Sequence, residues 1–456
     1  MTEQLKLKLN DSKATRWGAL VIVAFTMMAA YYVNDVVAPL KTMLETDLAW
    51  SSTDFGFFTG GYSFLNVFFL MLIWGGLILD RFGIRFTGKL ATILMVGGTA
   101  LEYYAMTGLA GADATLFGIN EIFGYKTGVF VAFAGYSIFG VGAEVAGITV
   151  SKIIAKWFKG KELATAMGVQ VALARIGSQA GYAVAIPLAR AFGISTPVLL
   201  GLVLLLGGMI AFFVFAVMDK KLDKQMEAAA IAAGTEDEEE KFSFKDVKNI
   251  LVNPGFWLIA LLCVLFYSCV FPFQKFASEL MIIKYGINEN VAGTFAGLPA
   301  LGALILTPVF GGFIDKRGKS ASIMLLGSAM LICVHFIYAI PDINYWLVAI
   351  VLMIILGIAF SLVPSAMWPA VAKIFPVSQL GTAYALIFFI QNIGLWGIPT
   401  LIGWVLDAYC ISGKKPDGTN MYDYTVPMCI FTGIACLSLI VALLLKKADK
   451  KYGYKL

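Results

Sequence analysis

Two opposite charges stand alone in neighbouring apolar segments of the sequence. Glu144 is the single acid of one apolar run and Arg175 the single base of the next, with a basic hairpin between them. Counted from that hairpin at about 1.5 Å per helical residue, both would lie roughly 12–18 Å deep in a membrane. A lone charge at that depth costs on the order of 3 kcal/mol by insertion scales. The two residues are therefore expected to bind the charged ends of one ligand, or to form a structural ion pair.

The composition explains why a membrane is expected. Of the 456 residues 59% are hydrophobic and only 14% are charged, whereas soluble domains carry about 25% charged residues. Apolar segments long enough to cross a bilayer recur along the whole chain. The fold class is therefore predicted to be an all-α, polytopic membrane protein with the lipid bilayer as its surroundings.

Several classes of function are disfavoured by the same sequence. The net charge of +5 does not indicate nucleic-acid binding, because the basic residues flank apolar segments. The six cysteines include no C-x-x-C pair, so neither a metal site nor a disulfide framework is expected. A nucleophile with a base, a phosphate loop and a dinucleotide fingerprint are also lacking. We therefore expect no enzyme and no cofactor.

Twelve transmembrane helices are predicted, in two groups of six. They span 17–40, 55–79, 86–108, 128–151, 163–189, 195–218, 255–280, 290–313, 320–341, 345–371, 379–405 and 424–446. The resulting domains are a tail (1–16), a first bundle (17–218), a charged linker (219–250), a second bundle (251–446) and a second tail (447–456). Because the first segment has no cleavage site after it, we expect an uncleaved anchor.

The basic residues predict the orientation of these helices. If both termini and the linker are cytoplasmic, 26 of the 34 Lys and Arg fall on the inside, and Arg175 lies within the membrane. Cytoplasmic loops carry such an excess of basic residues, so both termini are predicted to be cytoplasmic. The seven remaining basic residues fall outside, and they are Lys41, Lys126, Arg190, Lys275, Lys284, Lys414 and Lys415.

Internal repeats relate the two groups of helices. The tetrapeptide at 163–166 (LATA) recurs 217 residues later at 380–383 (LGTA), and the segment at 76–83 resembles the segment at 311–318 at an offset of 235. The difference of 18 residues fits an insertion at about 107–127. The chain is thus expected to hold two parallel six-helix halves. At the first offset Arg175 aligns with Asn392, which is predicted to face the pathway.

A loop motif carries a resemblance to a known family. Gly76-x-x-x-Asp80-Arg81-x-Gly83-x-Arg85 resembles the loop between helices two and three of the major facilitator superfamily. In that family the loop latches the cytoplasmic side of two rocking halves. The resemblance implies a gating role for the motif's charged residues and for those of its second copy; a plain charged turn is the alternative. These residues are Asp80, Arg81, Arg85, Asp315 and Lys316.

Three longer stretches resemble one branch of that superfamily, the lysosomal dipeptide transporters. The stretches are FGVGAE at 139–144, WFKGKEL at 157–163 with ARIGS at 174–178, and WP at 368–369 with QLGTAY at 379–384 and QN at 391–392. The likeness covers nearly all twelve helices. In that branch an acid on helix four and an arginine on helix five bind the two ends of a dipeptide. Glu144 and Arg175 match those positions.

The chemistry of a dipeptide agrees with this pair. A dipeptide has an ammonium and a carboxylate roughly 5–7 Å apart, from a rise of about 3.3–3.6 Å per residue. A carboxylate suits the first group, and the forked guanidinium suits the second. The sequence thus predicts a membrane transporter of dipeptides or short peptides, working by alternating access as a uniporter or linked to protons. An organic-anion exchanger, with Arg175 binding a carboxylate, and a non-transporting receptor or scaffold remain as alternatives.

Other residues receive less specific expectations. Tyr31 and Asp35 on helix one are predicted to line the path, with an outer gate as the alternative for Asp35. Trp368 is expected either to form an aromatic wall or simply to pack near the inner end. Lys275 and Glu279 follow a proline in helix seven. They are expected either to gate the outer side or to lie at a solvent-exposed end of the helix.

The compartment is less clearly indicated by the sequence. The short first tail lacks an acidic dileucine sorting signal. A bacterial inner membrane or another cell-surface membrane therefore fits better than a lysosome, which stays possible for a eukaryotic chain. The resemblance does not extend to the accessory subunit of the lysosomal transporters, so no such subunit is predicted for this chain.

Overall fold

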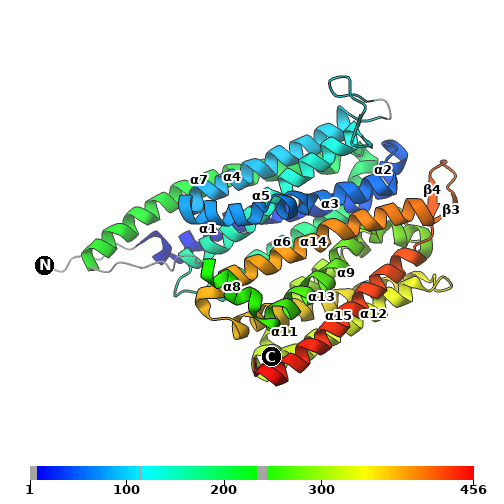
Figure 1. Ribbon diagram of the computed structural model, residues 1–456. Coiled ribbons are helices and arrows are strands. Elements are labelled where there is room, and N and C mark those ends of the chain that lie inside the picture. The colour runs from blue at the N-terminus through cyan, green and yellow to red at the C-terminus, as the bar shows by residue number, and fades with distance from the viewer. Residues whose placement is uncertain (1–7, 112–113, 234–243) are drawn as a thin grey trace.

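Helices make up nearly all of the structure, a computed structural model that describes residues 8–111, 114–233 and 244–456 (Figure 1). Two short antiparallel hairpins join helices on one side of the molecule. The helices are α1 Lys13–Val36, α2 Lys41–Asp47, α3 Ser52–Phe68, α4 Met71–Thr107, α5 Thr127–Trp157, α6 Leu163–Phe192, α7 Thr196–Ala233, α8 Phe244–Val252, α9 Pro254–Tyr285, α10 Glu289–Ala296, α11 Leu298–Arg317, α12 Ser320–Ala339, α13 Trp346–Ile374, α14 Val377–Tyr409 and α15 Thr425–Tyr452; the hairpins pair β1 Glu121–Ile122 with β2 Tyr125–Lys126 and β3 Ile411–Lys414 with β4 Asn420–Tyr422, and short 3-10 turns span Leu9–Asp11 and Ala38–Leu40.

The second predicted helix is broken. It begins as α3, stops at Phe69, and resumes in α4 after a bend of 58° at Leu70, whose φ is 54°. The same α4 holds the end of the second predicted helix and the whole of the third. These two parts meet at a kink at Gly83, whose φ of 75° and ψ of 173° suit glycine. Nine helices of the described chain, or ten with the bent pair, are long and apolar enough to cross a membrane by themselves. Counted by position, the structure contains all twelve predicted helices.

The two halves repeat one packing scheme. In the first half α1 packs against α6 and α7, and α5 packs against α3 and α4; in the second half α9 packs against α14 and α15, and α13 packs against α11 and α12. Between the halves, α3 packs along α14, while α6 packs along α10 and α11. These two interfaces are equivalent under the internal repeat, since each joins the second helix of one half to the fifth helix of the other.

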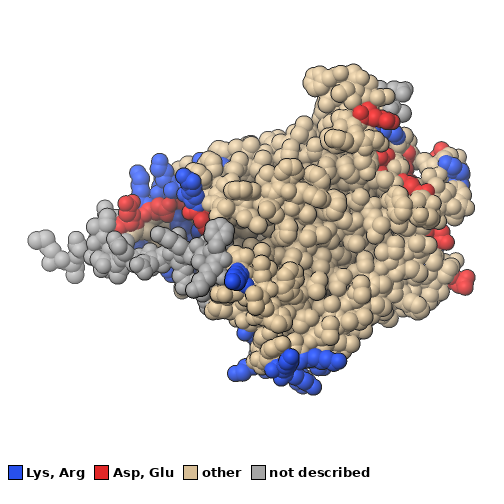
Figure 2. Space-filling model, viewed as in Figure 1, with Lys and Arg blue, Asp and Glu red and all other residues tan. Residues whose placement is uncertain are grey.

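The surface is that of a protein embedded in lipid. On the face shown in Figure 2, charged side chains gather at two ends, and a wide band of uncharged residues lies between them. Large apolar side chains are exposed on this kind of surface, for example Ile210 (63%) on α7 and Ile305 (65%) on α11. Such exposure is costly in water and favourable in a hydrocarbon layer. The start of the described chain, at Leu9–Asp11, and the end of α15 both lie at the end where Lys and Arg are most prominent.

The amino-terminal segment is tied to the first half on that basic end. Arg16 donates two hydrogen bonds to Glu162, at 2.7 and 3.2 Å, and Lys161 donates to Asp11 at 2.6 Å. The hydrogen bond from Arg16 lowers the pKa of Glu162, and the one from Lys161 lowers the pKa of Asp11. Both carboxylates therefore stay ionised near neutral pH, and the segment follows the motion of the first half.

The halves meet through polar contacts at the end opposite the termini. Lys41 Nζ lies 2.6 Å from Glu279 and also contacts Glu45, while Lys415 lies 3.5 Å from Glu45 and 3.6 Å from Glu279. We call these four residues, of which Lys415 is partly buried and the other three are buried, the outer cluster. At the end with the termini, the ion pairs of Lys13, Arg16, Arg85, Lys152, Lys156 and Lys161 all join residues within the first half. The structure is therefore closed on one side, the side with β3 and β4 in Figure 1.

Candidate substrate site

A cavity of about 580 Å³ lies between the two halves, on the inner side of the outer cluster. Its walls come from α1, α3, α4, α5 and α6 of the first half and from α9, α13 and α14 of the second. It extends from Asn34 and Lys275, near the closed end, to Ser151 and Gln170, toward the ends of α5 and α6 that face the basic side. A volume in this range suits a small molecule.

Glu144 lies on one wall of this cavity. The side chain projects from α5 and accepts a hydrogen bond of 3.0 Å from the hydroxyl of Tyr62 on α3. A close helix contact holds these residues together: Gly140, one turn before Glu144, lies so near Tyr62 that an added Cβ would stand 2.0 Å from the Tyr62 carbonyl oxygen. One carboxylate oxygen is thus held by the protein while the residue still faces the cavity.

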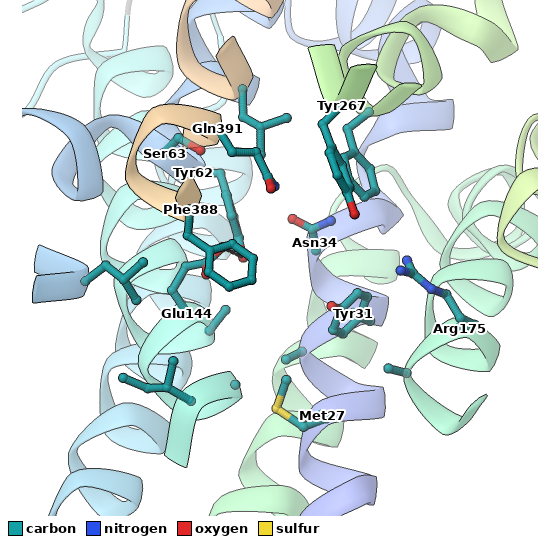
Figure 3. Close-up of a pocket in the computed structure, with 18 of the residues that line it drawn as sticks. Met27, Tyr31, Asn34, Tyr62, Ser63, Glu144, Arg175, Tyr267, Phe388 and Gln391 are labelled. Atoms are coloured by element: carbon teal, nitrogen blue, oxygen red, sulfur yellow. Dashed lines mark hydrogen bonds between the residues drawn. The ribbon is translucent and has the colours of Figure 1, made fainter. Parts of the chain in front are cut away.

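Arg175 lies on the opposite wall, across the cavity from Glu144 (Figure 3). Its guanidinium carbon is 5.5 Å from the ring centre of Tyr31 and 4.9 Å from that of Phe360, which are cation–π distances. The backbone of α6 is close to α1 here, because a Cβ on Gly177 would stand 2.1 Å from the Met28 carbonyl oxygen. The structure records no ion pair between Arg175 and Glu144, so each charge is presented to the cavity separately.

Aromatic rings form a third wall. Trp368 of α13 stacks on Phe388 of α14 at 4.8 Å and donates from its indole nitrogen to the hydroxyl of Tyr267, at 3.3 Å. All three residues line the cavity, and Tyr31 lies between Glu144 and Arg175 in the close-up (Figure 3). Of the two expectations for Trp368, the structure places it in the cavity wall rather than only in the helix packing.

Two of the expected substrate residues do not line the cavity. Asn392 is 1% exposed and donates its amide to the Phe388 carbonyl oxygen, while its neighbour Gln391 lines the cavity instead. Asp35 is 7% exposed, and its neighbour Asn34 takes the place on the wall. In both cases the observed lining residue is one position away, which is about 100° around a helix. A direct substrate contact of Asp35 or Asn392 is therefore not supported by this geometry.

Asp35 has a different partner. Lys275 of α9 lies 3.1 Å from its carboxylate and also donates to the Asn34 carbonyl oxygen at 2.6 Å, and Ser178 donates to the other oxygen of Asp35 at 2.6 Å. Lys275 belongs to the second half and Asp35 to the first. The pair thus joins the halves at the outer end of the cavity, and the outer-gate alternative for Asp35 and for Lys275 stays a prediction.

The loop motif makes its contacts inside the first half. Asp80 accepts from Lys152 at 3.1 Å, and Arg85 lies 2.9 Å from Asp223 on α7. Arg81 lies over the ring of Phe82, at 5.6 Å. In the second copy Lys316 is exposed, and the side chain of Asp315 lies outside the described part of the structure. A latch between the halves is not formed by the described residues of the motif in this state.

Comparison with known proteins identifies the family. The model of the family described as Major Facilitator Superfamily matches residues 20–398, and residues 286–453 in a second, overlapping match. The chain belongs to the Major Facilitator Superfamily. It is accordingly an integral, multi-pass membrane transporter of a small molecule, as the sequence predicted, and not an enzyme.

Similar proteins within the superfamily are named as dipeptide transporters. The chain is 29% identical to the lysosomal dipeptide transporter MFSD1 of Homo sapiens over 409 residues, which are 87% of this chain and 81% of that one. It is 33% identical to the protein of that name from Gallus gallus over 287 residues, 60% of this chain and 62% of that one. These relatives confirm the resemblance seen in the sequence.

Solved structures confirm the major facilitator fold. The nucleoside transporter NupG superposes with a TM-score of 0.69 at 12% identity, covering 94% of this chain and 98% of that one. A peptide transporter called POT, solved with sulfate, gives a TM-score of 0.68 at 13% identity and covers 97% and 95%. At these identities the likeness concerns the fold alone.

Proposed function

We propose that this transporter moves dipeptides by alternating access, with Glu144 binding the ammonium end and Arg175 the carboxylate end. The observation that carries the proposal is the placement of the two charges on opposite walls of one cavity, without an ion pair between them. A ligand with two opposite charges would complete both sites at once. The similarity to lysosomal dipeptide transporters supports the same substrate class.

The geometry also fits recognition by the main chain of the substrate. Glu144 and Arg175 face the cavity from opposite walls, polar groups such as Asn34 and Gln391 also line it, and Tyr267, Trp368 and Phe388 present aromatic rings. Rings accept varied side chains without requiring a specific hydrogen bond. We therefore infer that the carrier accepts dipeptides of different sequence and selects for free ends.

The orientation and the membrane belong to this proposal. The basic end of the molecule carries the start of the described chain and the end of α15 (Figures 1 and 2), which supports cytoplasmic termini by the positive-inside rule. The cavity then reaches toward the cytoplasm. The membrane would be the cell membrane, or a lysosomal membrane if the chain is eukaryotic, as the relatives' name indicates.

The test compares a free dipeptide with the same dipeptide acetylated on its amino group. Calorimetric titration is expected to give at least about tenfold weaker binding, 1.4 kcal/mol, for the acetylated compound. Glu144→Gln keeps the acceptor for Tyr62 but removes the charge, and it is expected to lose a similar factor for the free dipeptide. Glu121→Gln, on the exposed strand β1, is the matched control and is expected to bind normally.

The alternatives predict different results in the same experiment. An organic-anion exchanger would bind both dipeptides equally well and would bind dianions no worse after Glu144→Gln. A receptor without flux would bind the dipeptide but would not carry labelled dipeptide into proteoliposomes. Equal affinity for the acetylated and the free dipeptide would overturn the dipeptide assignment.

A further inference from the structure

One carboxyl group is buried in the first half without any partner. Glu102 of α4 is 0% exposed, and both of its carboxylate oxygens lack a hydrogen-bond partner. The backbones of α4 and α5 pack closely here: a Cβ on Gly135 of α5 would stand 2.8 Å from the Glu102 backbone nitrogen, and one on Gly98 would stand 2.4 Å from the Phe139 nitrogen. A buried polar atom without a partner from the described chain calls for one.

The charged neighbours of Glu102 are already engaged. The ammonium of Lys275 on α9 acts electrostatically on Glu102, and Glu102 in turn acts on Tyr136 of α5, the residue after Gly135. The ammonium of Lys275, however, is held by Asp35, by the Asn34 carbonyl oxygen and, at 3.4 Å, by the Tyr136 hydroxyl. One buried ammonium thus balances one carboxylate, and an ionised Glu102 would leave an uncompensated negative charge.

The other packed elements supply no countercharge. Residues 196–218 of α7, which packs against α4, contain no titratable side chain. On α3, Asp54 caps its own helix through Ser51, and Tyr62 donates to Glu144. Asp407 of α14 accepts from Thr53. A buried ion without a partner costs several kcal/mol, which binding of a proton removes.

We propose that Glu102 is a proton-binding site that is linked to the outer gate through Lys275, and this role rests on the proposed transport function. With the proton bound, Lys275 has a single carboxylate to hold it on the first half. Without the proton, two carboxylates attract the same ammonium, and α9 is held more firmly against the first half. Loss of the proton therefore favours the closed outer side, and binding of the proton eases its opening.

The linkage makes transport depend on pH at the outer side. Coupling between two sites typically changes an equilibrium by about 5–150-fold, and we expect at least about fivefold faster dipeptide uptake into proteoliposomes at acidic than at alkaline outer pH. Glu102→Gln imitates the protonated form, and it is expected to transport at a rate that no longer follows the outer pH. Glu121→Gln is the control and is expected to keep the pH dependence.

A second measurement needs no substrate. The infrared C=O stretch of an un-ionised carboxylic acid is expected in the wild-type protein and is expected to be lost in Glu102→Gln; Glu102→Met serves if the first variant folds poorly. Absence of that band, or an identical pH profile in the wild type and the variant, would overturn the proposal. Because Glu102 does not line the cavity, dipeptide binding is expected to survive in the variant. Failure of the proton site is thus distinguishable from failure of the dipeptide assignment.

The experiment also separates a proton from a metal cation. Replacing sodium by a bulky organic cation is expected to leave uptake unchanged at a fixed pH. If uptake instead required sodium in the wild type and not in Glu102→Gln, the site would hold sodium and the proton proposal would fall.

Discussion

Arg175 lies within cation–π distance of two aromatic rings, those of Tyr31 and Phe360. Its guanidinium is planar, so that its paired N–H groups can meet both oxygens of a carboxylate at once. A lysine would keep the charge but would lose the fork and the stacking on the rings.

The first prediction follows from that plane. Arg175→Lys is expected to weaken dipeptide binding by at least about tenfold, and Arg175→Ala by more. Calorimetric titration of the purified carrier measures both. Wild-type affinity in the lysine variant would mean that a point charge suffices, and wild-type affinity in the alanine variant would remove Arg175 from the site.

The sequence located the charged residues of the site better than the uncharged ones. Glu144 and Arg175 could be found because a charge inside an apolar segment is costly and therefore conspicuous. Tyr62 and Phe388 gave no such signal, because aromatic residues are as common in helix packing as in cavities. Asp35 and Asn392 were each one position away from the residue that lines the cavity, since pattern and repeat alignment do not resolve 100° of helix rotation.

At the scale of elements, glycines let the two halves approach. On α14, a Cβ added to Gly403 would stand 2.3 Å from the Ser52 carbonyl oxygen and 2.9 Å from the Gly56 Cα on α3. This contact between α3 and α14 lies in their outer parts, so it exists only while the outer side is closed. Small residues serve close helix packing of this kind in membranes.

The second prediction uses this contact. Gly403→Val is expected to hold α3 and α14 apart and to shift the carrier toward states open on the outer side. Spin labels at Asp47 and Lys414, both exposed, would report the longer distance in a cysteine-free background. Gly397→Val on the same helix, where an added Cβ meets nothing within 4 Å, is the control. An unchanged distance distribution in the Gly403 variant would show that α3 and α14 accommodate the larger side chain without opening the outer side.

The helices themselves were predictable from apolar length, and the breaks were not. The bend at Leu70 and the merging of two helices at Gly83 depend on backbone angles that hydropathy does not encode. Likewise α7 continues to Ala233, well into the predicted linker, because a polar helix beyond the membrane leaves no apolar signal.

At the scale of the whole molecule, the outer cluster joins the halves by charges that balance. Two lysines and two glutamates lie together, and Tyr424 donates to Glu279 as well. Removing one partner of a buried group of charges is much more costly than removing a neutral pair.

The third prediction is that a second substitution, which restores the balance of charges, compensates for the first. Lys41→Met alone leaves an excess buried negative charge and is expected to open the outer side, since water can then reach the carboxylates. Adding Glu279→Gln restores the balance and is expected to return most of the closed population. The same pair of spin labels measures both variants. If the double variant opened as far as the single one, the specific contact rather than the charge balance would hold the halves together.

The burial of the outer cluster also makes water a participant in the cycle. The charged groups of Lys41, Glu45 and Glu279, which are buried in the closed state, must be hydrated when the outer side opens and buried again when it closes. Solutes that are excluded from protein surfaces favour burial, so osmotic stress on the outer side acts against opening while it leaves the cavity and its ligand contacts untouched. The carrier thereby becomes sensitive to the activity of water around it, and a cell in a concentrated medium would take up its substrate more slowly at the same substrate concentration.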